Sequence, residues 1–343
     1  MQDFTKNTGF IAQDPRETDY IAGAVDIGSI NNQTGDWSQY LPSGEKQGGV
    51  YFDSMACVSF SAINVAETEI NYLLQTNQLP KETVAFLDRE GYLVDGEVNF
   101  SDRFIAKLSG TTRVGNYLTT VMDTIRKYGL IPESEWTFDT AQRTPAFDWD
   151  DYYAPVPQAL QDKGKKFLDY FDIKYSWLVA GGQAVPAQMK EWLKSGPLQI
   201  ASATCPGWST GDVNACSLPI NHATMIYGID DTRYKLFDHY TPFEKTLALD
   251  YKIPFVMRII VTPKSVVEKP EASYDVAFSK KQAGKMLLAV EDLGSLWYVT
   301  PEGKRAKVGR KPEEVAHFLD LVNQKKVPVT GITNKDISKI EIV

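Results

Sequence analysis

Hydrophobic residues recur at helical spacing in the first half of the chain, most clearly between Cys57 and about Gln75. The apolar residues there are mostly three or four positions apart, which predicts a long helix with a buried face. They are Ile63, Ala66, Ile70, Leu73 and Leu74. Asp53 and Ser54 stand just before this run, and both residue types are suitable for capping the helix.

A second helix is expected from Val114 to about Tyr128. Gly129 follows it, a residue type at which helices commonly end, and Pro132 lies just beyond. Residues 140–160 then hold three prolines among aromatic and acidic residues. We expect a loop-rich connection there.

Beyond this connection the hydrophobic residues form short β-prone runs separated by Gly, Asp or Pro. Such runs predict strands. The runs cover residues 199–203, 223–228, 234–237 and 256–261. A mostly helical first half followed by a β-rich second half predicts an α+β fold with two lobes.

With 343 residues, the chain is long enough for one large domain and one small one. Residues 1–45 are polar and turn-rich, so we expect an extended N-terminal arm that is too short to be an independently folded inhibitory prodomain. The helical lobe is predicted over about 46–150 and the β-rich lobe over about 160–265. Together with the arm they form one domain, residues 1–265.

Residues 274–343 follow a charged linker that contains prolines, and we expect a small α+β accessory domain there. Two β-prone runs, 286–290 and 296–299, flank an Asp-Leu-Gly turn and predict a hairpin. Pro312 is expected to begin a helix with an apolar face. The Leu-Trp-Tyr-Val and Gly-Lys-Arg segments resemble small domains that accompany some bacterial surface proteins, which favours a role in attachment to a partner.

The charge balance argues against nucleic-acid binding, because 36 Lys and Arg face 44 Asp and Glu. No run reaches the roughly 18 apolar residues that span a bilayer, and the first twenty residues lack the pattern of a secretory signal. These features favour a cytoplasmic or virion-associated protein. Three scattered cysteines and three histidines offer no metal-ligand spacing, so we expect neither a metal nor another cofactor. Cys205 and Cys216 are close enough to bridge a short loop, although a reduced pair is equally allowed.

Cys57 is a candidate nucleophile, because a thiol in the first turn of a helix faces unpaired N–H groups that favour the thiolate. His222 is the best candidate for its base. His317 is predicted on the C-terminal helix away from the apolar face. His239 follows Asp238, and if the two alternate along a strand, His239 points away from the site when Asp238 faces it. A cysteine, a later histidine and a still later aspartate are the parts of a nucleophile, its base and the group that orients the base.

Several segments resemble the papain-like cysteine peptidases. The run Cys57-Val58-Ser59-Phe60-Ser61 resembles the Cys-Trp-Ala-Phe-Ser that opens the central helix of this family. Asn221-His222-Ala223 resembles the Asn-His-Ala around the family's base, and Asp238 stands 16 residues after the histidine, where the family has Asn. Gly115-Asn116-Tyr117 resembles its Gly-rich substrate strand. The resemblance covers roughly residues 40–262 and implies the two-lobe fold of the family.

The resemblance also implies roles for single residues. Cys57 would attack the scissile carbonyl as a thiolate, His222 would hold the proton and pass it to the leaving amine, and Asp238 would orient the imidazole. Gln47 would donate its side-chain amide to the oxyanion, together with the backbone N–H of Cys57. The substrate-binding site would include Gly115, Asn221 and Tyr240.

The chain departs from the family at four positions. Gln47 lies ten residues before Cys57, four more than in papain, so residues 48–55 must loop out if Gln47 is to reach the oxyanion. Val58 and Tyr240 each stand where the family has Trp. Asp238 replaces Asn, and its negative charge should hold His222 protonated to higher pH.

The resemblance therefore implies a metal-free cysteine peptidase that acts on a polypeptide or peptide-like substrate through an acyl-enzyme thioester. No prodomain of the family's type is recognised, which favours a phage- or bacterium-encoded member. Two alternatives stay open at this point. One is a papain-fold structural or binding protein without turnover, such as a virion or surface component, and the other is an amide hydrolase that acts on cell-wall peptide.

Overall fold

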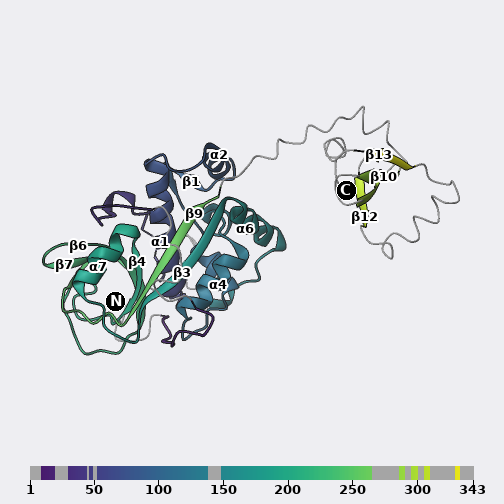
Figure 1. Cartoon of the computed structure of the whole chain (residues 1–343). Coiled ribbons are helices and arrows are strands. Elements are labelled where there is room, and N and C mark those ends of the chain that lie inside the picture. Colours follow the sequence, from purple (N-terminus) through teal and green to yellow (C-terminus); the bar gives the residue numbers. More distant parts are fainter. Residues whose placement is uncertain are drawn as a thin grey trace. The chain divides into compact units, whose positions relative to one another are not determined.

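The computed structural model describes residues 9–19, 30–44, 46–48, 52–137 and 148–264, together with four short strands between 286 and 332. Its contacts divide the chain into two units, Met1–Val266 and Val267–Val343. The first unit contains helices and one large sheet, and the second contains a small sheet (Figure 1). Among the described residues, the helices are too short or too polar to cross a membrane.

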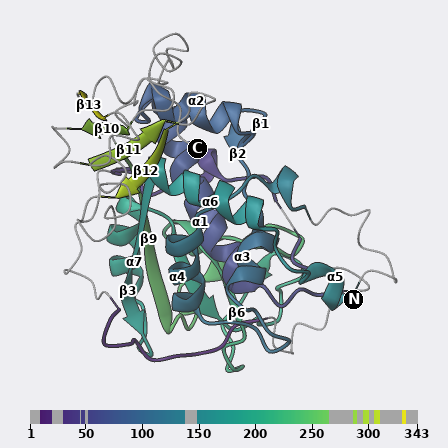
Figure 2. The ribbon, with the colours of Figure 1, turned by 90° about the vertical axis from the view of Figure 1, so that its right-hand side faces the viewer.

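The helices of the first unit come before its large sheet in the chain, except for the last two, which follow the first strand of that sheet. They are η1 (Ser38–Tyr40), α1 (Cys57–Gln75), α2 (Lys81–Arg89), α3 (Asp102–Leu108), α4 (Leu118–Tyr128), η2 (Glu133–Glu135), α5 (Trp149–Tyr152), α6 (Gln158–Tyr170), α7 (Pro186–Trp192) and η3 (Leu193–Ser195). A short hairpin of β1 (Leu93–Val94) and β2 (Glu97–Val98) lies among them. Helices α4 and α6 pack on each other and on the edge strand β3 (Figure 2).

The large sheet has seven strands in the order β3-β9-β4-β6-β7-β8-β5, antiparallel except for the β5–β8 pair. Its strands are β3 (Phe171–Ala180), β4 (Leu198–Ser202), β5 (Asp212–Val213), β6 (His222–Ile229), β7 (Arg233–Phe237), β8 (Glu244–Ala248) and β9 (Phe255–Pro263). The four predicted strands correspond to β4, β6, β7 and β9. The predicted α+β class, with a helical lobe and a β-rich lobe, is confirmed.

Helix α1 has the predicted bounds, but the predicted cap is wrong. Ala56 occupies the cap position and contributes no side-chain hydrogen bond. Met55 has a positive φ of 55°, so a turn separates the helix from the residues expected to cap it. Asp53 Oδ1 accepts the N–H of Met55 within that turn, at 2.9 Å. The first N–H groups of α1 therefore have no carboxylate or hydroxyl cap.

Two buried glutamates of α1 connect the helix to both lobes. Glu67 Oε1 accepts the backbone N–H of Phe100 in the helical lobe at 2.7 Å. Glu69 Oε2 accepts the backbone N–H of Val261 on β9 at 2.8 Å. Because a buried N–H is costly to leave without a partner, these contacts fix the rotation of α1. The position of Cys57 at its first residue is fixed with it.

Helix α4 differs from its prediction at one end, and several helices, α6 among them, were not predicted. Helix α4 begins at Leu118 rather than Val114, because Gly115, at a φ of 103°, forms a tight turn in which its N–H donates to the carbonyl of Thr112. Helix α6 was not predicted. Its sequence is mostly polar with an internal glycine, and only Gly164 and Phe167 are buried. This pattern resembles a loop more than an amphipathic helix.

The second unit contains a four-stranded sheet in the order β12-β11-β10-β13. The predicted hairpin is confirmed as β10 (Met286–Ala289) paired antiparallel with β11 (Ser295–Val299). Strand β12 (Arg305–Gly309) pairs with β11, and β13 (Val329–Ile332) runs parallel to β10. The helix predicted to begin at Pro312 lies outside the described residues.

Candidate active site

Cys57 opens α1 and is fully buried. Its thiol is close enough to the backbone of Ala223 for a hydrogen bond. Ala223 follows His222 at the start of β6, so the thiol lies against the end of the strand that carries the histidine. The structure therefore places the Cys57 thiol near the residue that follows His222, although Cys57 and His222 are 165 positions apart in the chain.

The electrostatic surroundings of Cys57 differ from the sequence expectation of a favoured thiolate. Burial raises the pKa of the thiol far above its usual range. Backbone hydrogen bonds at Ala223 and Val58 lower that pKa, whereas the carboxylates of Asp53 and Asp238 raise it further. In this closed arrangement the neutral thiol is the favoured form.

His222 is held by the sheet and by a carboxylate. It pairs with Ser202 of β4 and is fully buried. Its Nε2 lies 2.7 Å from Oδ1 of Asp238, the residue that follows β7. The predicted histidine–aspartate contact is therefore present, at hydrogen-bond distance and away from water.

Both carboxylate oxygens of Asp238 have hydrogen-bond or ion-pair partners that the sequence did not indicate. Trp208 donates its indole N–H to Oδ2 at 2.7 Å. The Nζ of Lys245 on β8 lies 2.9 Å from the same oxygen, and the side chains of both partners are fully buried. Burial alone would raise the pKa of Asp238, but the charges of His222 and Lys245 hold it far below its usual range.

His239 does not point away from the site as predicted. Its ring centroid lies 4.7 Å from that of His222, and its Nε2 lies 3.8 Å from Asp238 Oδ1. The alternation expected of a strand does not apply, because β7 ends at Phe237 and both residues lie in the following loop. Burial lowers the pKa of His239 well below its usual value, and its two ring nitrogens have no hydrogen-bond partner among the described residues.

Gln47 lies beside the histidines of the site. Gly48 and Asp53 form an antiparallel bridge, which brings the chain back towards Gln47 before α1. The N–H of Gln47 donates to the carbonyl of His239 at 3.0 Å. Its side-chain amide donates to Asp53 Oδ1 at 2.8 Å. Gln47 is thus buried next to the histidine side of the site, with its amide engaged by a carboxylate.

Tyr240 and Trp208 both cover His222. The Tyr240 ring lies 5.5 Å from the imidazole at 39°, and its hydroxyl donates to Asp53 Oδ2 at 2.7 Å. The Trp208 ring lies 5.3 Å from the imidazole and stands nearly perpendicular to it, at 88°. Tyr240, which was predicted to bind substrate, therefore covers the imidazole together with a tryptophan from an earlier loop.

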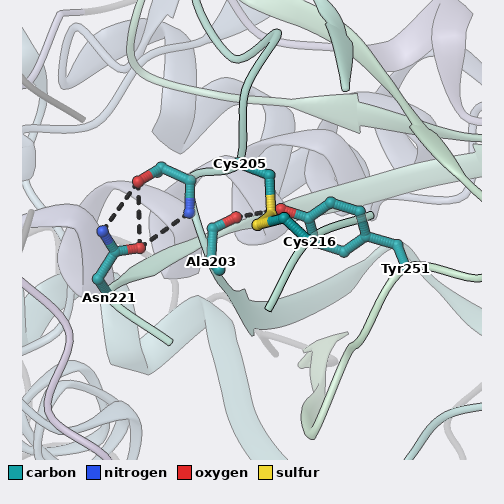
Figure 3. The surroundings of a disulfide bond; sticks show 6 residues. Ala203, Cys205, Cys216, Asn221 and Tyr251 are labelled. Carbon is teal, nitrogen blue, oxygen red and sulfur yellow. Dashed lines mark hydrogen bonds between the residues drawn. A yellow bond between two sulfur atoms is a disulfide. The ribbon is translucent and has the colours of Figure 1, made fainter. Parts of the chain in front are cut away.

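A disulfide encloses the loop that carries Trp208. Cys205 and Cys216 are bonded, which resolves the alternatives left open by the sequence in favour of the bridge. On one side of the bridge, Asn221 accepts the N–H of Thr204 at 2.9 Å (Figure 3). Asn221, predicted to bind substrate, therefore ties this loop to the start of β6.

Residues 9–11 of the N-terminal arm lie along the predicted substrate strand. The N–H of Asn116 donates to the carbonyl of Gly9, and the N–H of Ile11 donates to the carbonyl of Asn116, both at 2.9 Å. These bonds form a parallel bridge between Phe10 and Asn116. The Phe10 side chain is buried, with its ring 5.6 Å from that of Phe255.

Glycines allow the arm to approach this closely. A Cβ on Gly115 would lie 2.0 Å from the carbonyl oxygen of Gly9. A Cβ on Gly9 would in turn lie 2.0 Å from the carbonyl oxygen of Met55, two residues before Cys57. The predicted substrate contact at Gly115 is therefore covered by the chain's own arm.

His222, Asp238 and His239 place three possible ligand atoms within 4.8 Å of one another. The sequence showed no such grouping, because it arises from a strand start and a loop that meet only in the fold. Lys245 already supplies a positive charge to the shared carboxylate. A cation bound there would lie close to this ammonium group and would be repelled by it.

Similar chain paths occur among solved structures of papain-like cysteine proteases. Xylellain from Xylella fastidiosa is 14% identical, with a TM-score of 0.45 over 78% of this chain and 99% of that one. Procathepsin L2 proteinase from the larval midgut of Tenebrio molitor is 12% identical, with a TM-score of 0.44 over 76% and 79%. The bromelain protease from Ananas comosus is 13% identical, with a TM-score of 0.38 over 67% and 97%. No protein-family model matches the chain, and no curated protein does so either. At these identities, the chemistry of the site has to be judged from its own side chains.

Proposed function

We propose that this protein is a cysteine-type peptidase in which Cys57 is the nucleophile, His222 its base and Asp238 the group that orients the base. The observation that carries the proposal is the buried contact of 2.7 Å between His222 Nε2 and Asp238 Oδ1. The backbone of Ala223, the next residue along β6, lies near enough to the Cys57 thiol to lower its pKa. These two observations support a nucleophile, a base and an orienting carboxylate supplied by three distant segments of the chain.

The proposed reaction begins when the Cys57 thiol transfers its proton to Nδ1 of His222, since Nε2 faces Asp238. The thiolate then attacks the carbonyl carbon of the substrate. The developing oxyanion would be stabilised by the backbone N–H of Cys57 and by the side-chain amide of Gln47, which would turn from Asp53 towards it. The imidazolium gives its proton to the leaving amine, and a thioester remains on Cys57.

Hydrolysis of the thioester completes the cycle. His222 takes a proton from water as the water oxygen attacks the thioester carbon. The carbon–sulfur bond then breaks, the carboxylic acid leaves, and Cys57 regains its proton from His222. Every proton in this sequence moves through the one imidazole, which Asp238 keeps in a fixed orientation.

Substrate binding would require the N-terminal arm to be replaced. An extended peptide beside Asn116 can form the two backbone hydrogen bonds that Gly9 and Ile11 form in this structure. The entry of a substrate carbonyl and water next to Cys57 would also reduce the burial that raises the pKa of the thiol. We therefore include displacement of the arm as a step that precedes attack.

The test is selective alkylation of the thiol. In a Phe10→Ala background, in which the arm is no longer firmly seated, iodoacetamide at about pH 6 should modify Cys57 faster than it modifies a free cysteine peptide, although this pH is well below the pKa of an ordinary thiol. His222→Ala should remove this advantage, and His317→Ala is the control. Equal slow modification of the protein and of its His222→Ala variant would contradict the proposal and support a structural or binding protein without turnover. The E64 inhibitor, which the bromelain structure contains, serves as a second probe.

The class of substrate follows from a separate assay. Casein and purified peptidoglycan should be offered to the same preparation, with Cys57→Ser as the inactive control. Release of peptides from casein supports the peptidase, whereas cleavage of peptidoglycan alone supports the amide hydrolase of cell-wall peptide. We assign the unit at Val267–Val343 an accessory role in attachment, which its separate expression and a partner pull-down would test.

A further inference from the structure

A buried ammonium group lies behind the catalytic pair of the proposed peptidase. Lys245 Nζ is 2.9 Å from Asp238 Oδ2, while His222 contacts the other oxygen of the same carboxylate. Lys245 also donates to the backbone carbonyls of Tyr240, at 2.6 Å, and of Pro242. Its side chain is fully buried, so it has no access to water.

We propose that Lys245 is the counter-ion that allows an aspartate to orient the catalytic histidine, so that the Asp238–Lys245 pair acts as one neutral acceptor for the imidazole N–H. This inference rests on the proposed function. It names a positioning residue, because Lys245 acts on His222 only through Asp238. A neutral asparagine would provide an acceptor of the same net charge without needing a counter-ion.

The physical reason is the sensitivity of a buried imidazole to net charge. A carboxylate without a counter-ion would hold His222 as an imidazolium and make it a poor acceptor for the Cys57 proton. A paired carboxylate still accepts the imidazole N–H and fixes the ring. Its field at the ring is reduced by the ammonium group on its far side. Lys245 therefore sets the proton affinity of the base without touching it.

The other groups around Asp238 do not supply this charge. His239 faces the carboxylate at 3.8 Å, but burial lowers its pKa, which favours the neutral ring. Trp208 donates a neutral N–H. The hydroxyl of Tyr240 faces Asp53. The nearby acidic charge, Asp53, has the same sign as Asp238, so Lys245 is the cation that this cluster contains among the described residues.

The experiment compares Lys245→Met, Asp238→Asn and the double variant Asp238→Asn/Lys245→Met with the parent chain. Lys235→Met is the matched control, because Lys235 forms a partly exposed ion pair with Asp36 outside the site. The first readout is the pH dependence of Cys57 alkylation by iodoacetamide. The second is the NMR titration of the His222 ring in a Cys57→Ala background, which needs no turnover.

The expected shifts have opposite signs. Lys245→Met leaves the carboxylate unpaired and should raise the pKa of His222 by about one unit or more. Asp238→Asn leaves the ammonium unpaired and should lower that pKa by a similar amount. The double variant should return to within about 0.3 unit of the parent, a residual well below the shift caused by one nearby charge. Lys235→Met should change neither readout.

The other outcomes distinguish a failure of the charge pairing from a failure of the proposed function. A His222 pKa that does not move in Lys245→Met means that the lysine only packs. If a single variant fails to fold, the double variant must recover the thermal midpoint, and a double variant no better than the worse single one also overturns the pairing. A His222 titration that shifts as expected, in a protein whose thiol is never activated, rejects the peptidase and retains the charge pairing. A reactive Cys57 thiol together with a His222 titration that is the same in all variants rejects the charge pairing and retains the peptidase.

Discussion

The two sides of the candidate site are built differently. On the sheet side, Asp238 lies between His222 and Lys245, and each of them contacts one of its two carboxylate oxygens. On the helix side, Cys57 has backbone hydrogen bonds and two repelling carboxylates, and the arm passes close to it at Met55. The sheet side is preorganised for proton transfer, whereas the helix side is held in a state that disfavours the thiolate. Activation should therefore change the helix side and leave the sheet side in place.

The largest effect is expected from removing the centre of the sheet side. Asp238→Ala leaves Lys245 buried without a counter-ion, which should cost about 3–5 kcal/mol of unfolding free energy. The variant should also lose nearly all activity, because His222 is no longer oriented. Chemical denaturation and peptide hydrolysis measure the two effects. A stable Asp238→Ala protein would mean that the ion pair contributes little.

A test of the helix side is Phe10→Ala. Loss of a buried aromatic ring should weaken the seating of the arm by about 3 kcal/mol or more. If the arm limits access, iodoacetamide should modify Cys57 at least several-fold faster than in the parent. Leu79→Ala is the control, because it also removes a buried apolar side chain but lies near the far end of α1. Equal acceleration in both variants would indicate general loosening instead.

The loop that carries Trp208 offers a smaller perturbation of the sheet side. Cys205→Ser/Cys216→Ser opens the disulfide loop, which should lower the unfolding free energy by about 2–4 kcal/mol. Because Trp208 then donates to Asp238 less rigidly, activity should fall by a few-fold and not vanish. Thermal unfolding and steady-state kinetics test this together. Unchanged kinetics would show that Trp208 is positioned without the bridge.

The smallest effect concerns α1 away from the site. Burial raises the pKa of Glu69 well above its usual value, although the charge of Arg258 lowers it. Because this pKa is higher in the folded state than in the unfolded state, the unfolded chain loses the proton first as pH rises. The free energy of unfolding should therefore fall as pH rises above about 4.5. Glu69→Gln keeps an acceptor for the Val261 N–H and should remove this decline. We expect equal stability of parent and variant at about pH 4 and a more stable variant at about pH 8, by denaturation at both values.

The sequence was most informative where a local pattern coincides with burial. Helix α1 and four strands of the sheet followed from hydrophobic spacing, and Cys57, His222 and Asp238 followed from residue type and order. Helix α6 escaped because its side chains are mostly polar around Gly164.

Lys245 escaped for a different reason. It is one of many lysines in the chain, and its burial makes sense only beside Asp238, which packing alone brings within reach. The same holds for Trp208, whose partner is 30 positions away. The error at His239 came from extending a strand by two residues. Local patterns therefore identify the candidate reacting residues, whereas their charged and polar neighbours are determined by tertiary contacts.

The glutamate pair of α1 has a further mechanical consequence. Glu67 forms a hydrogen bond with the helical lobe and Glu69 forms one with the sheet, so helix α1 is attached to both lobes. A hinge motion of one lobe relative to the other would have to break these buried hydrogen bonds. The two lobes should therefore behave as a rigid receptor, and access to the site should depend on the N-terminal arm. Replacing the sequence of the arm then offers a route to changing which peptides bind.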